Sequence, residues 1–152
     1  MSDELVFMMG QFEARFPTDR RYGKNHMWAH RQDERTWRFG FSAYAVRLLQ
    51  DVYFLDWDID APAVITERQE IGQIESSKAE SSLYVPISGR LTRINDVLLK
   101  DPTAINVDKY STGWLFEIEG DGNELLTPTA YLEHLTDAWK VAERTIKGQL
   151  NQ

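Results

Sequence analysis

The segment with the clearest chemical potential is residues 75–79, which place one lysine, Lys78, between two strand-like runs. Residues 70–74 precede it and residues 83–87 follow it, so a tight turn is expected between two paired strands. A lysine at a hairpin tip is exposed to a modifying enzyme, and its side chain stands clear of the protein body. The pattern suits a side chain that carries a covalently attached group, and the alternative is an ordinary solvated surface lysine.

The order of motifs along the chain, more than this lysine alone, indicates a family. The segment Glu75-Ser76-Ser77-Lys78-Ala79 resembles Glu-Ser-Val-Lys-Ala, the lipoylation segment of the glycine cleavage H proteins in the lipoyl-domain superfamily. Further segments between Tyr22 and Glu119 resemble the same family in the same order. They are residues 22–28, 40–45, 51–55 and 85–89, then Asn95, Pro102, residues 105–106 and residues 113–114.

This resemblance implies a lipoyl carrier that is not itself an enzyme. Lys78 would be amidated with lipoate, and tethering would present the attached group to successive active sites at high effective concentration. The arm would shuttle an aminomethyl group and reducing equivalents among a glycine decarboxylase, an aminomethyltransferase and a lipoamide dehydrogenase. The related biotin carriers usually show Met-Lys-Met, which Ser77-Lys78-Ala79 does not match.

Two positions near Lys78 match those that lipoate-attaching enzymes recognise in such domains. Glu75 lies three residues before the lysine, and Gly89 lies eleven residues after it. The alternatives are a plain solubilising charge for Glu75 and a plain turn residue for Gly89. Their spacing favours a recognition role for both.

Three positions depart from the family and remove polarity from the expected resting surface of the arm. Met27 replaces the glutamate of His-Glu-Trp, Ser82 replaces an aspartate four residues after the lysine, and Leu48 replaces a histidine of some members. A loaded aminomethyl ammonium needs polar or acidic partners. Glu80 and His26 are further candidates for that surface, although a lone histidine beside a tryptophan is more often a structural residue. The alternatives are therefore an H-like lipoate-binding carrier of another pathway, such as sulfur oxidation, or an unlipoylated H-like scaffold.

The sequence patterns around these residues predict a mainly β protein. The expected architecture is a lipoyl-type flattened barrel or sandwich of two antiparallel sheets, with short helices and a C-terminal helix. Within residues 113–119 apolar and polar side chains alternate in the manner of a half-buried strand, with Glu117 on the polar face. Other strands are expected at residues 27–31, 35–41, 51–57 and on both sides of Lys78, with a helix at 43–50, a helical turn at 96–100 and a loop at 58–67.

The chain divides into three segments. Residues 1–21 are expected to be an extension that forms an additional edge strand or packing arm, and residues 22–120 to be the lipoyl domain. Residues 121–152 are expected to form a C-terminal helix packed on the same domain. Thr127 and Pro128 are typical of a helix start, and apolar residues then recur at helical spacing, with Trp139 on the buried face.

Composition and charge exclude several classes of function. The 152 residues carry a net charge of −7, with a pI near 4.9, which argues against binding to nucleic acid. Without cysteine there are no disulfides, thiolate metal sites or cysteine nucleophiles, and the three histidines lack ligand-like spacing, so no metal site is expected. The acidic N-terminus does not resemble a signal peptide and no stretch is long enough to span a bilayer. The expected location is the cytoplasm of a bacterium, with no membrane partner.

Overall fold

Three antiparallel sheets and a long helix make up the part of the chain that the computed structural model describes, residues 3–150, with side chains described up to residue 144. The six-stranded sheet has the order β3 (Arg21–Tyr22), β4 (Met27–Arg31), β5 (Thr36–Phe41), β11 (Phe116–Glu119), β10 (Gly89–Ile94) and β7 (Ala63–Ile65). The three-stranded sheet has the order β6 (Val52–Trp57), β8 (Glu70–Ser76) and β9 (Glu80–Tyr84), and β1 (Glu4–Met9) pairs with β2 (Phe12–Pro17). The helices are α1 (Ala43–Leu49), α2 (Val97–Lys100), α3 (Ala104–Val107) and α4 (Pro128–Leu150).

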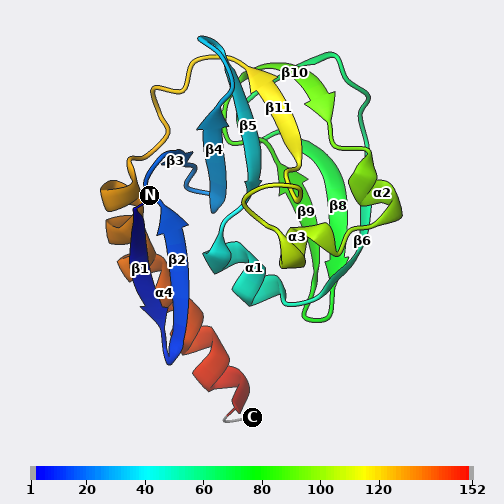
Figure 1. Cartoon of the computed structure of the whole chain (residues 1–152). Helices are drawn as coiled ribbons and strands as arrows, with labels where there is room; N and C mark the ends of the chain where they lie inside the picture. The colour runs from blue at the N-terminus through cyan, green and yellow to red at the C-terminus, as the bar shows by residue number, and fades with distance from the viewer. Residues whose placement is uncertain (1–2, 151–152) are drawn as a thin grey trace.

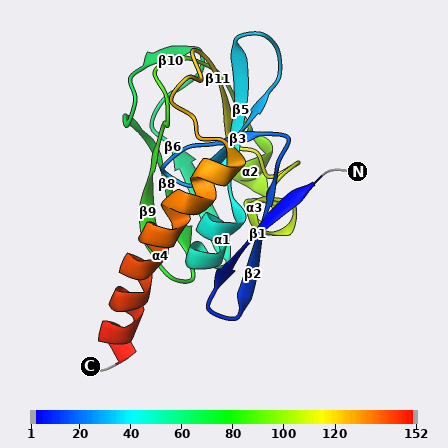
Figure 2. The ribbon, with the colours of Figure 1, turned by 90° about the vertical axis from the view of Figure 1, so that its left-hand side faces the viewer.

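The two larger sheets form the body of the molecule, and the β1–β2 hairpin and α4 lie together on one side of it (Figures 1 and 2). The predicted mainly β architecture of antiparallel sheets, with short helices and a C-terminal helix, is confirmed. Within the described residues the strands do not close into a continuous barrel. Of the two predicted arrangements, a flattened barrel or a sandwich, the structure is therefore the sandwich.

The larger hydrophobic core lies between the six-stranded and the three-stranded sheet. Alternate side chains of each strand point to opposite faces, so each sheet turns one apolar face toward the other. The contributors include Met27, Phe39 and Phe116 from one sheet and Leu55, Ile74 and Leu83 from the other, none of them more than 4% exposed. Burial of each such side chain stabilises the fold by about 1.5–3 kcal/mol relative to exposure.

Strand β4 separates this core from a second, smaller one. Its Met27 and Ala29 belong to the sandwich core, whereas Trp28 points to the opposite face and is 1% exposed. The N-terminal hairpin, α1 and α4 cover that opposite face. The buried aromatic and aliphatic members of the second core include Phe16, Tyr22, Tyr44, Tyr131 and Leu135.

The N-terminal extension forms a complete hairpin where an edge strand or packing arm was expected. Tyr110 links this hairpin to α1, because its hydroxyl donates to the Arg15 carbonyl at 2.6 Å and accepts from the Ala43 N–H at 2.9 Å. Phe7 also meets the edge of the Tyr44 ring, with centroids 6.5 Å apart. The hairpin is therefore fixed to α1 by both polar and aromatic contacts.

The C-terminal helix begins as its sequence predicts. Thr127 Oγ1 accepts the Ala130 N–H at 3.2 Å, and Pro128 occupies the first helical position. Tyr131 and Leu135, one turn apart, are fully buried. Trp139 is only half-buried, at the edge of the second core, where it meets the Tyr44 ring at 6.4 Å. Trp139 therefore lies on the core-facing side of the helix, as expected, but its side chain is not fully buried.

Two short elements were missed by the sequence prediction. The loop expected at residues 58–67 contains β7, which pairs with the start of β10 through Ile65 and Gly89. The four-residue helix α3 follows α2 directly. Elements this short contain too few residues to display a periodic pattern, and long-range contacts fix them instead.

Glu117 was expected on the exposed face of its strand, but it is only 5% exposed. Cross-strand neighbours explain this burial, since Arg38 and Arg93 lie opposite it on the two adjacent strands. Arg38 donates to the Glu117 carboxylate at 2.8 Å, and Arg93 lies 3.6 Å from it. Both guanidinium groups also stack over the Trp114 ring, at 4.4 and 5.3 Å from its centroid. The alternation of apolar and polar residues predicts that Glu117 faces solvent, but the side chains of Arg38, Arg93 and Trp114 cover it.

Candidate functional site

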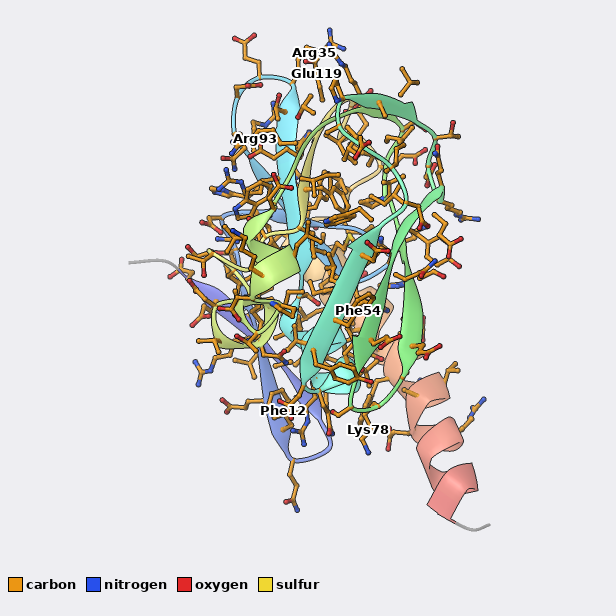
Figure 3. The ribbon with its side chains drawn as sticks, turned by 90° about the vertical axis from the view of Figure 1, so that its right-hand side faces the viewer. Phe12, Arg35, Phe54, Lys78, Arg93 and Glu119 are labelled. Atoms are coloured by element: carbon orange, nitrogen blue, oxygen red, sulfur yellow. The ribbon has the colours of Figure 1, made fainter. Side chains whose placement is uncertain are left out.

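Lys78 lies exposed in the tight turn that joins β8 to β9, at one end of the molecule (Figure 3). Ser76 closes the turn: its N–H donates to the Ala79 carbonyl at 2.9 Å. Its hydroxyl accepts from the N–H groups of Lys78, at 3.3 Å, and Ala79, at 3.2 Å. Because these bonds fix the backbone, the lysine side chain projects from a rigid support.

The turn is also attached to the body through Ser77 and Asp51. Ser77 N–H donates to the Asp51 carbonyl at 2.9 Å, and Asp51 N–H donates back to the Ser77 hydroxyl at 3.2 Å. Asp51 lies between α1 and β6, so this pair of bonds joins the lysine-bearing turn to the end of α1. Sequence reasoning gave neither residue a role.

Asn106 of α3 supports the same junction from the other side. Its Oδ1 accepts the Val52 N–H at 2.9 Å, and its Nδ2 donates to the Gln50 carbonyl. The backbone on both sides of Asp51 is therefore held by one amide side chain. In the sequence, the resemblance of residues 105–106 to the family was the signal that could have pointed to Asn106.

Glu75 lies in β8 next to the turn, directly opposite Glu80 of β9 and Phe54 of β6. Residues directly opposite in antiparallel strands share a face, so the two carboxylates flank the base of the turn on the outward face of the three-stranded sheet. Ser82 lies two residues beyond Glu80 on the same face, opposite Gln73. An enzyme that modifies Lys78 would meet this acidic face beside the lysine.

Gly89 lies far from Lys78. A Cβ at Gly89 would lie 2.2 Å from the Glu119 carbonyl oxygen, and its φ of 151° is one that other residues rarely adopt. Figure 3 shows Glu119 at the opposite end of the molecule from Lys78. Close packing therefore explains this glycine, and the structure does not bring it together with Glu75 and the lysine.

The residues expected to line one resting surface for the arm are dispersed. Met27 is 1% exposed inside the sandwich core, so it does not lie on that surface. Leu48, 39% exposed, lies on α1, whereas Glu80 and Ser82 lie on the outward face of the three-stranded sheet. His26 is half-buried beneath α4. The three positions that depart from the family therefore do not lie together on a single nonpolar surface.

His26 belongs to a polar cluster that joins β4 to α4. Its Nδ1 lies 3.0 Å from the Tyr131 hydroxyl, which in turn lies 2.9 Å from the Ser42 hydroxyl. The rings of Tyr44 and His134 lie 4.5 and 5.6 Å from its ring centroid. Burial, with a smaller contribution from the nearby His134, lowers the pKa of His26 to about 4, from 6.5. The arrangement supports the structural alternative for His26.

This shift predicts a loss of stability in mild acid. The unfolded chain takes up a proton near pH 6.5 and the folded chain only near pH 4, so the stability contributed by His26 declines between these values. We expect the free energy of unfolding to fall by on the order of 3 kcal/mol across that window from this residue. Urea unfolding of the parent and of His26→Asn at several pH values measures the difference.

Asparagine suits this comparison because it accepts the positive φ of His26, 71°, and can still hydrogen-bond to Tyr131. It does not titrate, so the variant should lose less stability than the parent between pH 6.5 and 4. Equal losses in the two proteins would show that His26 does not titrate in this way.

Among the described residues there is no group of three or more acidic, histidine or cysteine side chains arranged to hold a metal ion. No helix in that part of the chain is both long enough and apolar enough to cross a membrane.

The sandwich of antiparallel sheets with a lysine on an exposed, rigid hairpin turn defines a carrier domain of the lipoyl type. Residues 20–143 match the family model for the glycine cleavage H-protein. A glycine cleavage system H protein of Mycobacterium tuberculosis (strain ATCC 25177 / H37Ra) is 36% identical over 122 residues, which cover 80% of this chain and 90% of that protein. A probable glycine cleavage system H protein of Natronomonas pharaonis is 40% identical over 121 residues, which cover 76% of this chain and 92% of that protein.

A solved structure shows the same fold. The crystal structure of a glycine cleavage system H protein from Mycobacterium marinum superposes with a TM-score of 0.69 at 28% identity, covering 80% of this chain and 99% of that one. The chain belongs to the glycine cleavage H-protein family. It is a non-catalytic lipoyl carrier of this family.

Proposed function

We propose that Lys78 is the lipoyl attachment residue, with lipoate joined to its Nζ through an amide bond. The observation that carries this proposal is the rigid, exposed turn: the lysine side chain is free while the backbone beneath it is held by Ser76 and Asp51. When bound, the lipoyl group supplies the dithiolane that accepts and releases the transported group. The protein contributes a fixed origin for the arm and keeps its swing confined to one end of the molecule.

Glu75 and Glu80 give the attaching enzyme an electrostatic feature to recognise. Both carboxylates lie on the face beside the turn, and a basic surface on the enzyme would bind them while its active site receives Lys78. Gly89 does not enter this proposal because it packs against Glu119, at the opposite end of the molecule from Lys78.

The proposed partners are the enzymes that successively visit the arm: a glycine decarboxylase, an aminomethyltransferase and a lipoamide dehydrogenase. The load is an aminomethyl group, as in glycine cleavage. The main argument for another pathway was one nonpolar arm surface built by Met27, Leu48 and Ser82, and these residues do not converge. The acidic sequence without cysteine and the bacterial relatives support a bacterial cytoplasmic carrier.

Intact-mass analysis after expression in a host that attaches lipoate tests the proposal. We expect one lipoyl adduct per chain, and peptide mapping should place it on Lys78. Lys100 and Lys109 serve as internal controls on the same peptide map. An unmodified chain, or an adduct on either control lysine, would contradict the assignment.

A further inference from the structure

A groove of about 340 Å³ opens between the N-terminal hairpin, α1 and α3. Phe12 of β2 contributes one wall, and Val46 and Arg47 of α1 contribute another. The rest of the lining includes Asp51, Asn106 and Lys109. The residues that support the lysine-bearing turn thus also line this groove.

The groove combines an apolar surface with positive charge. Phe12 and Val46 supply the apolar part, and the Arg47 guanidinium lies 4.3 Å from the centroid of the Phe12 ring. Arg47 and Lys109 contribute two cations against the one carboxylate of Asp51. Among the described side chains, no carboxylate lies within salt-bridge distance of either cation. Such a lining favours a neutral or anionic apolar group over a cationic one.

The groove lies within reach of an arm attached to Lys78. Asp51, in its lining, bonds to Ser77, which directly precedes the lysine. Within α1 the helical rise from Val46 to Leu49, the last residue of the helix, is only roughly 4.5 Å, and an extended lipoyl-lysine, with single bonds of ordinary length, spans on the order of 10–15 Å. Figure 3 shows Phe12 and Lys78 at the same end of the molecule.

The Phe12 wall is an addition to the family fold. The family match begins at residue 20, so the whole β1–β2 hairpin precedes it. The hairpin is nevertheless fixed to α1 through Tyr110. A relative that lacks this hairpin would leave the corresponding side of α1 open.

We propose that this groove is the resting site of the unloaded lipoyl arm, with the dithiolane against Phe12 and Val46. The inference rests on attachment at Lys78, as proposed above. A reduced arm, which can form a thiolate, is also compatible with the two cations. An aminomethyl ammonium is repelled by the same cations, so loading favours departure of the arm from the groove.

Amide chemical shifts locate the arm directly. Spectra of the isotopically labelled, unmodified protein and of the lipoylated protein are compared residue by residue. We expect shifts at residues 77–79 and also at Arg47, Asn106 and Lys109, because the dithiolane contacts the groove. In lipoylated Phe12→Ala the shifts at the three remote residues should disappear while those at the turn persist.

Val6→Ala is the matched control, because Val6 lies on the same hairpin, is 42% exposed and does not line the groove. That variant should retain the remote shifts. An adduct on Lys78 with shifts confined to residues 75–80 in the parent would overturn the groove alone. Absence of the adduct by mass would overturn the attachment and, with it, this inference.

Discussion

Replacement of Lys78 by arginine should abolish lipoylation completely without destabilising the protein. The arginine side chain retains a positive charge, but its guanidinium does not form the ordinary amide with lipoate. The turn itself should be unaffected, since its bonds involve the Lys78 backbone N–H and not the side chain. The expected result is a loss of the adduct from every chain, with an unchanged melting temperature, measured by intact mass and thermal unfolding of the same preparations.

The matched control is Lys100→Arg, a substitution of another exposed lysine at the end of α2. This variant should carry the adduct to the same extent as the parent. Modification that persists in Lys78→Arg would place the arm elsewhere on the chain, and loss of modification in both variants would point to a general failure of recognition.

Tyr131→Ala should be the most destabilising single substitution on the C-terminal helix. The ring is fully buried, stacks on Tyr22 at 4.7 Å and meets the edge of Phe16 at 5.4 Å. Its hydroxyl also contacts Ser42 and His26, which would lose a partner. A large-to-small change at such a site costs about 3–5 kcal/mol, and unpaired polar groups add to that cost. Urea unfolding measures the free-energy difference.

Two further variants separate the contributions to this effect. Tyr131→Phe keeps the ring contacts and removes only the hydroxyl, so its cost should be about 1–2 kcal/mol. Glu133→Ala, at an exposed position on the same helix, should change stability by less than about 0.5 kcal/mol. A loss below about 1 kcal/mol for Tyr131→Ala would mean that the second core contributes little to the stability of the sandwich.

Turns and helix ends that depend on neighbouring residues could be predicted from the sequence. The turn around Lys78 was predictable because a short polar segment joins two strand-like runs, and the start of α4 because Thr127 and Pro128 are typical of a helix start. The strand Met27–Arg31 was predicted with the bounds that the structure shows. In each case the physical cause lies within a few residues of the position concerned.

Features that depend on distant segments were not predictable in the same way. The burial of Glu117 requires two arginines from neighbouring strands, and the anchoring of Ser77 requires Asp51 from the end of α1. Met27 occupies a position where a family comparison suggests a surface residue, yet the alternation of β4 directs it into the core. The pairing of strands, which fixes these neighbours, cannot be read from any one segment.

The division into two cores on either side of β4 has a consequence for how the molecule opens. The hairpin and α4 share the smaller cluster, so they can separate from the body in a subglobal unfolding event that leaves the sandwich closed. The bonds between Ser77 and Asp51 lie outside that cluster and would survive such an event. Amide hydrogens in β1, β2 and α4 would then exchange through a lower-energy opening than those in β8. Phe12 would then move away from the groove together with the hairpin, while the turn that carries Lys78 would keep its position.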